Sequence, residues 1–296
     1  MMNTYTINWI LLLILSAIWG GAFTLNKYSL EVYTPEMIVA GRLIIGALLL
    51  VVILLIRNGS ITIKTEDWKY YAFMSIVGIV APFLLISYGQ IDIDSSLAGI
   101  LMATMPISTL LLSHIFLDDE FLTKKKIAGF VIAFLGIIVL IMPEIFFFPS
   151  ISDNILSELM VMSGAILYSC SAVYGKKNKV TGPLNASTGT IFYSAVIMSI
   201  YLFSFDSPLE SEISYPHLIG ILMLGVFCTA VATIIYFQIL QTSGASFISI
   251  MNYLIPIWSI FFGVIFLDED IFINYLVGLL IVIYGIKLSQ GDFKKA

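Results

Sequence analysis

The stretch PISTLLLSHIFLDDE, residues 106–120, recurs 150 residues later as PIWSIFFGVIFLDED, residues 256–270. Both stretches begin with Pro-Ile, and both contain the run Ile-Phe-Leu-Asp near their end. Similarity at a nearly constant offset extends along the chain in the same order, which indicates an internal duplication. We therefore predict two repeats, residues 1–145 and residues 146–296. The further matches pair Trp19 with Tyr168, Lys27 with Lys176, Tyr88 with Tyr236, Gln90 with Gln238, Gly129 with Gly278, and Gly136 with Gly285.

The composition is that of a membrane protein. Of the 296 residues, 59% are hydrophobic and 11% are charged, and the mean hydropathy is +1.02. A soluble domain carries about 25% charged residues. Lipid admits only helices or closed barrels, and the apolar runs lack the strict alternation of barrel strands. We predict an all-α integral membrane protein with ten transmembrane helices, near residues 8–26, 36–56, 68–89, 95–117, 126–142, 156–174, 185–205, 217–240, 245–267 and 272–289.

The basic residues lie almost entirely in alternate loops. All Lys and Arg except Lys27 and Arg42 fall on the side that an N-terminus in the cytoplasm would place in the cytoplasm. We therefore expect a multi-pass protein of the bacterial cytoplasmic membrane with both termini cytoplasmic. Each predicted repeat has five spans, so the second enters the bilayer from the opposite face. Such inverted-topology repeats are typical of carriers that alternate between two open forms.

Several function classes are disfavoured. With 14 Lys and Arg against 19 Asp and Glu, the net charge is −5, and no basic face is available to bind nucleic acid. Cys170 and Cys228 lie in apolar runs, so we expect neither a disulfide framework nor a metal site. The sequence lacks a G-x-x-x-x-G-K-[ST] loop, an H-E-x-x-H motif and a G-x-S-x-G motif. We expect no cofactor and no catalytic residues.

Three features together resemble a known family. They are the WGGAF segment followed by Lys27, the Pro35 to Arg42 pattern, and two endings with a proline, an acidic turn and a Glu nine residues before a Gly. The chain resembles the EamA family of the drug/metabolite transporter superfamily along nearly its whole length. The resemblance implies ten helices, cytoplasmic termini and a secondary carrier for small metabolites, often an exporter. The second repeat has Tyr168-Ser169 in place of Trp19-Gly20 and no counterpart of Arg42.

Arg42 is the charged side chain that we expect to matter most, because it lies inside a predicted span. A charge at the bilayer centre costs about 2.5–3.5 kcal/mol on insertion scales. Arg42 could anchor a substrate carboxylate or phosphate, or it could extend to the outer headgroups. Trp19, beside two glycines, and its counterpart Tyr168 are expected to line a central pocket. The predicted substrate-binding residues are Trp19, Arg42, Thr104, Ser108, Tyr168, Asn252, Tyr253 and Trp258.

Pro106 and Pro256 are predicted to break their helices and free backbone carbonyls, as in the discontinuous helices of carriers. Gln90 and Gln238 end two equivalent helices and are candidates for gating or capping. Glu120, Glu269 and Lys27 lie at the predicted interfaces. We expect each glutamate to pair with a lysine or a helix N-terminus, whereas proton coupling through them or through His114 is the alternative.

We predict a secondary transporter that exports small metabolites, such as amino acids or related compounds. An importer or exchanger of a nucleotide-like or phosphorylated metabolite is the alternative within transport. A membrane-embedded enzyme or a channel is disfavoured, because few ionisable groups and no polar stripes lie in the spans. The expected partners are a small-molecule substrate and the lipid bilayer, with proton coupling as an option. A homodimer through the fifth and tenth spans would use Gly278 and Gly285.

Overall fold

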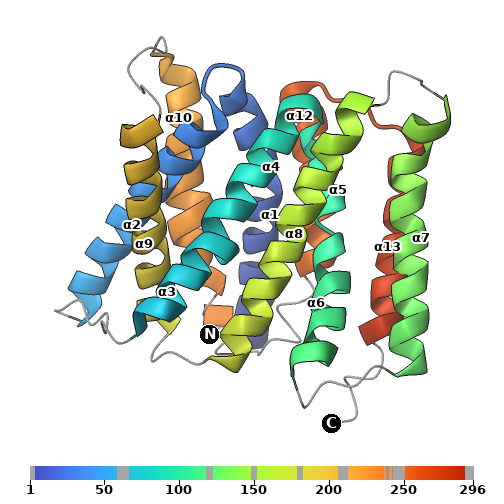
Figure 1. Ribbon diagram of the computed structural model, residues 1–296, viewed down its shortest axis with the longest axis horizontal. Coiled ribbons are helices and arrows are strands. Elements are labelled where there is room, and N and C mark those ends of the chain that lie inside the picture. Colours follow the sequence, from blue (N-terminus) through green and yellow to red (C-terminus); the bar gives the residue numbers. More distant parts are fainter. Residues whose placement is uncertain are drawn as a thin grey trace.

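The computed structural model describes residues 4–58, 67–117, 123–147, 152–178, 183–205, 213–236, 238–239, 242 and 251–290. Within these ranges the chain is helical and has no strand (Figure 1). The helices are α1 (Thr4–Leu30), α2 (Pro35–Asn58), α3 (Trp68–Ser75), η2 (Ile76–Val80), α4 (Ala81–Asp92), α5 (Ser95–Leu101), α6 (Thr104–Phe116), α7 (Lys124–Phe147), α8 (Ser152–Lys177), α9 (Pro183–Phe205), α10 (Tyr215–Met223), η3 (Leu224–Val231), α12 (Met251–Leu267) and α13 (Ile273–Gln290).

Every predicted span overlaps at least one of these helices. In the described residues, seven helical segments are long and apolar enough to cross a membrane. Two further apolar helices, Leu254–Leu267 and Ile273–Leu288, are shorter. The prediction of an all-helical membrane protein is therefore confirmed, whereas ten crossings and an inverted repeat stay predictions.

Two π-helical segments continue α-helices: η2 lies between α3 and α4, and η3 follows α10. In a π-helix each backbone N–H bonds to the carbonyl five residues earlier. These segments account for well under 1% of residues in ordinary proteins. At the end of η2, the Ala81 N–H bonds to the Ile76 carbonyl. Pro82, in the first turn of α4, has no N–H to donate to Gly78. The first residue of η2 lies 148 positions before that of η3, the same offset that separates Tyr88 from Tyr236. Such segments often occur at functional sites.

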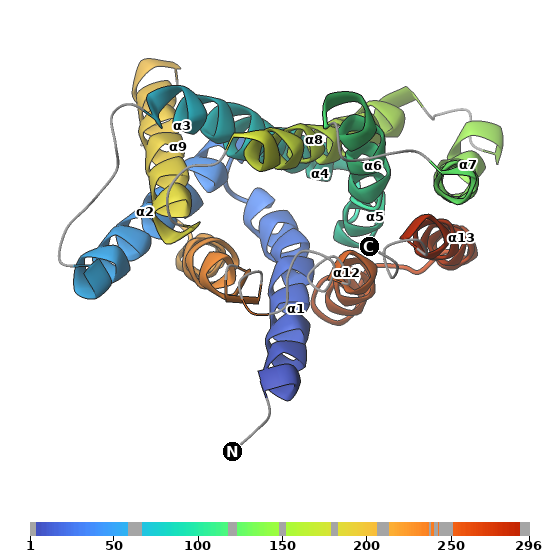
Figure 2. The ribbon, with the colours of Figure 1, turned by 90° about the horizontal axis from the view of Figure 1, so that it is seen from below.

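The first and second halves of the chain are interleaved rather than placed side by side. Here "first half" means the described residues up to 147, and "second half" means those from 152 onward. Helix α1 packs along α12, α2 along α9, and α4 along α8. Seen from below in Figure 2, α1 lies between the α2–α9 group and the α12–α5 group. A site near the middle of the bundle can therefore take residues from both halves.

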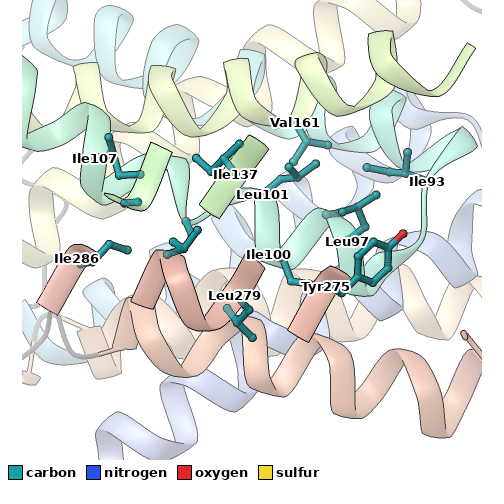
Figure 3. Packing of buried hydrophobic residues seen from close by; sticks show 14 of the residues in the cluster. Ile93, Leu97, Ile100, Leu101, Ile107, Ile137, Val161, Tyr275, Leu279 and Ile286 are labelled. Atoms are coloured by element: carbon teal, nitrogen blue, oxygen red, sulfur yellow. The ribbon is translucent and has the colours of Figure 1, made fainter. Parts of the chain in front are cut away.

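Helices α7 and α13 form a closely packed pair at one edge of the molecule (Figures 1 and 2). A Cβ atom added to Gly136 would lie 2.7 Å from Val282 Cγ2 and 3.0 Å from the Gly278 carbonyl. Gly285 faces Gly129 and Ala133 equally closely. The pair's buried side chains, including Ile137 and Leu279, join those of α5, α6 and α8 in one cluster (Figure 3).

The glycines that supported the predicted homodimer are therefore used within the chain. Gly278 and Gly285 let α13 approach α7 of the same molecule. A homodimer stays a prediction, without the support that these two glycines gave it.

The two termini lie at the same end of the bundle in Figure 1. We call the opposite end the distal end; it holds the turn between α1 and α2, the turn between α4 and α5, the start of α10 and the loop between α12 and α13. Under the predicted orientation, the distal end faces the outside of the cell.

Candidate functional site

The central feature is the Arg42 side chain on α2, which is only 7% exposed. Its Nε donates a long hydrogen bond of 3.4 Å to Thr229 Oγ1 in η3. Its guanidinium carbon lies 3.9 Å from the ring centre of Phe83 on α4. Among the described residues, Arg42 forms no ion pair with a carboxylate. The Arg42 side chain is buried within the bundle, and the described residues do not neutralise its charge.

Tyr168 on α8 completes the immediate surroundings of Arg42. Its ring centre is 6.3 Å from that of Phe83, in an edge-to-face arrangement. Tyr168 and Cys228 are both near the guanidinium. In the part of the chain that the structure describes, the Tyr168 hydroxyl has no hydrogen-bond partner. Four elements thus meet at Arg42: α2 and α4 from the first half, and α8 and η3 from the second.

Trp19 on α1 reaches the same region from another side. Its Nε1 donates to the carbonyl of Cys228 at 3.2 Å, and its ring lies 5.8 Å from that of Tyr236. The Cys228 carbonyl belongs to η3, where the wider spacing of the π-helix leaves carbonyls free for other donors. Tyr168 lies beside Phe83 at Arg42, whereas Trp19 contacts η3, the element that also supplies Thr229 to Arg42. That these three residues bind one cargo stays a prediction.

Thr104 lies at the predicted break of the first repeat. The helix is interrupted at Met102 and Ala103, between α5 and α6, and Pro106 follows two residues into α6. Ser169, next to Tyr168, donates to the carbonyl of Met105 at 2.9 Å. The Thr104 hydroxyl is buried and has no hydrogen-bond partner among the described residues. Ser108, one turn further, is half-buried.

The second repeat differs at its proline. Helix α12 continues through Pro256 without interruption, so the predicted break is absent from residues 251–267. Trp258 donates to Ser16 Oγ at 3.1 Å and stacks on Phe262, with ring centres 5.6 Å apart. It therefore joins α12 to α1 instead of facing Arg42. Asn252 and Tyr253 lie in the first turn of α12, and their side chains are outside the described residues.

Gln90 belongs to a buried polar network that joins α1 to α4. Its Oε1 accepts from Asn26 Nδ2 at 2.9 Å, and its Nε2 donates to the Phe23 carbonyl at 3.0 Å. Ser87 donates to Asn26 Oδ1. Lys27 donates to the carbonyls at the end of α4, those of Gln90 and Ile91. These contacts indicate a structural role for both residues. Gln238 is exposed.

Glu269 pairs with a helix N-terminus, as the sequence analysis expected. Its two carboxylate oxygens accept the backbone N–H groups of Ser95 at 2.7 Å and Ser96 at 2.9 Å, at the start of α5. The Ser96 hydroxyl donates to it as well. The preceding Asp268 has a positive φ of 52°. Glu120 lies outside the described residues, and His114 is exposed near the end of α6.

Two residues at the site and one elsewhere on α8 were not predicted from the sequence. Phe83 and Thr229 contact Arg42, but neither carries a sequence signal apart from Pro82 beside Phe83. Glu158 is only 1% exposed, near the start of α8. A single acid in an apolar run could have been noticed from the sequence alone.

A separate apolar groove of about 540 Å³ lies between α2 and α9. Ile44 and Leu48 line it, about half a turn around α2 from Arg42. Leu48 is 64% exposed and Phe203 is 85% exposed. This groove faces outward from the bundle and is not part of the Arg42 site.

The family model of the EamA-like transporter family matches residues 7–142 and again residues 155–289. The chain belongs to this family. An uncharacterized transporter of Archaeoglobus fulgidus is 30% identical over 285 residues, covering 94% of this chain and 96% of that protein. The uncharacterized transporter YoaV of Bacillus subtilis is 25% identical over 280 residues, 94% of each chain.

The protein PagO of Salmonella typhimurium is 22% identical over 249 residues, covering 84% of this chain and 81% of that protein. A solved crystal structure matches with a TM-score of 0.69 at 15% identity, over 96% of both chains, and so supports the fold alone. The family and its relatives point to a multi-pass membrane transporter rather than an enzyme.

Proposed function

We propose that this EamA-like transporter exports small metabolites with an acidic group, such as amino acids or related compounds, across the bacterial cytoplasmic membrane. Alternating access, ten membrane crossings in two inverted five-helix repeats and cytoplasmic termini are parts of the proposal. The observation that supports a cargo site is the buried Arg42 guanidinium, which has no carboxylate partner in the described chain.

The chemistry of Arg42 favours an anionic group on the cargo. A buried charge is costly unless an opposite charge and hydrogen bonds compensate it. The guanidinium carries five N–H donors, and Thr229 accepts from Nε alone. The two remaining nitrogens form the planar fork that binds a carboxylate through two parallel hydrogen bonds. Phe83 stabilises the cation through its ring face but adds no negative charge.

The position of the site suits a carrier. Arg42 and Phe83 come from the first half of the chain, whereas Tyr168 and Thr229 come from the second. A shift of one half against the other would therefore change the contacts around bound cargo. Cargo that binds the two forms with different affinity shifts their populations. The cargo gradient or proton exchange would supply the energy.

Metabolite measurements on cells that express the chain test the proposal. Cells are fed a mixed pool of amino acids and nucleosides, and mass spectrometry follows the medium and the cell extract. We expect at least one acidic compound to rise outside and fall inside with the wild type. Arg42→Ala should abolish the change, whereas Arg57→Ala, at the exposed end of the same helix, should keep it at equal protein level.

Two results would contradict the proposal. If Arg42→Ala exported as well as Arg57→Ala, Arg42 would not be the anchor. If a fed compound accumulated inside the cells, the direction would be uptake. Repeating the experiment with a phosphorylated metabolite in the medium tests a phosphate as the cargo group, which the same guanidinium fork also fits.

A further inference from the structure

A second polar cluster lies at the distal end, where the turn after α1 meets the start of α10. The imidazole of His217 stacks on the ring of Tyr28, with ring centres 4.3 Å apart and planes 18° apart. Its Nε2 lies 3.2 Å from Glu31 Oε2, and its Nδ1 lies 2.7 Å from Ser214 Oγ. The cluster therefore joins the first half of the chain to the second.

Tyr33 strengthens the same junction. Its hydroxyl accepts the backbone N–H of Ser214 at 3.1 Å and donates to the Ser214 carbonyl at 3.2 Å. Ser214 directly precedes α10, so both of its backbone groups are held by the turn between α1 and α2. Any motion that separates the start of α10 from that turn must break these contacts together with the His217 contact.

Protonation of the imidazole changes the strength of this junction. A neutral His217 can donate from Nε2 to Glu31 and accept at Nδ1 from Ser214. The protonated ring donates from both nitrogens, forms an ion pair with Glu31, and is a cation stacked on Tyr28. The positive end of the α10 dipole opposes that charge, but the carboxylate lies in direct contact with the ring, so the balance favours a tighter junction.

The junction is accessible to protons, and among the described residues few other charged groups lie on the elements that form it. The Glu31 side chain is 58% exposed and that of His217 is 15% exposed. From α1, Lys27 is turned toward the end of α4. From α2, Glu36 is buried in the first turn. Cys228 of η3 donates its thiol to the Ile18 carbonyl. Among these groups, Glu31 is the one in contact with the imidazole.

We propose that His217 and Glu31 form a pH-sensitive latch that holds the distal end closed more firmly as the pH on that side falls. This regulation rests on the proposed alternating access, in which cargo leaves through the distal end. A histidine changes charge between about pH 5 and 8. Acidification outside should therefore lower the fraction of molecules whose distal end is open.

Distances between spin labels test the latch without any cargo. The full-length chain is prepared in nanodiscs, with Cys170 and Cys228 replaced by alanine and labels attached at Ile91→Cys and Ile213→Cys, two exposed distal positions from different halves. We expect the ratio of short to long distances to rise about two- to fivefold from pH 8.0 to pH 5.5, the range for a partly exposed ion pair. Glu31→Gln and His217→Gln should each remove this change, and Asp270→Asn, at an exposed distal carboxylate, should keep it.

The latch is overturned if the distances are the same at both pH values, or if the change persists in Glu31→Gln and His217→Gln. Because the measurement needs no transport, it is independent of the cargo experiment. A pH-dependent distance change without any exported compound would leave the latch standing and reject the proposed function.

Discussion

Arg42 and Glu269 are two charged side chains in an apolar protein, and their surroundings are opposite. Glu269 is partly exposed, yet both carboxylate oxygens accept N–H groups of α5, and the Ser96 hydroxyl adds a third donor. Arg42 is almost fully buried, yet it has one long hydrogen bond and a ring face. A charged group whose hydrogen bonds are all made within the protein stabilises the fold. A buried charged group with unused donors is able to bind a ligand. The comparison therefore predicts that Glu269 variants lose stability and that Arg42 variants lose cargo.

The largest expected effect is on stability, in Glu269→Ala. The substitution leaves the N–H groups of Ser95 and Ser96 without their acceptor, and both serines are buried. Hydrogen bonds to a charged group contribute about 1.5–3 kcal/mol each, so we expect a loss of about 3 kcal/mol. Thermal unfolding in detergent measures it. Asp270→Ala, at the exposed neighbour, is the matched control, and equal stability of the two variants would contradict the assignment.

Arg42→Met should keep its stability and lose cargo binding, the reverse of Glu269→Ala. Replacing a buried charged side chain by an apolar one of similar length is often neutral or stabilising. We therefore expect no loss in the free energy of unfolding. Cargo binding should weaken by about 100-fold, because a two-bond contact between a guanidinium and a carboxylate is lost. Calorimetry with the compound found in the export experiment measures the binding. A strongly destabilised Arg42→Met protein would show that Arg42 is structural, like Glu269.

The sequence was sufficient for much of this fold. Apolar run lengths placed a helix at every predicted span, and Pro106 marked a real interruption between α5 and α6. Pro256 carried the same signal, but α12 continues through it. A proline lowers helix stability without deciding the outcome, because packing against neighbouring helices can outweigh the lost hydrogen bond. Trp258 of α12 provides such packing, because it lies against Gly20 of α1 and donates to Ser16 of the same helix.

The site could be predicted only in part, for a related reason. Arg42 was recognisable because a charge in an apolar run is rare. Phe83 and Thr229 were not, because phenylalanine and threonine are common in apolar helices. Their contact with Arg42 depends on how the helices with η2 and η3 pack around α2. Gln90 was predicted to gate the path or to cap a helix end, because an amide near a helix end is compatible with both roles; here it bonds to Asn26.

A smaller effect is expected at Ser96, which tests how the Glu269 contact is shared between its donors. Ser96→Ala removes the hydroxyl donor and keeps both backbone N–H groups. We expect a loss of about 1 kcal/mol, the typical net value of one hydrogen bond. Thermal unfolding beside Glu269→Ala gives the comparison. The double variant should be no less stable than Glu269→Ala alone; additive losses would mean that Ser96 acts through another contact.

The smallest effect is expected at Thr229, the single hydrogen-bond partner of Arg42 in the described chain. Thr229→Val keeps the shape of the side chain. It removes the acceptor that lies 3.4 Å from Nε and the hydroxyl that donates to the Leu224 carbonyl at 3.0 Å. The bond to Nε is near the geometric limit, so the change in stability comes mainly from the lost bond to Leu224, about 0.5 kcal/mol at the low end for one hydrogen bond. Among the described residues, Nε then has no acceptor. If Phe83 mainly positions the guanidinium and its other donors bind the anionic group of the cargo, cargo affinity should stay within about threefold of the wild type. A large loss of affinity, measured by the same calorimetry, would show instead that Thr229 aims the guanidinium, and Arg42 would then resemble Glu269 more closely than its burial indicates.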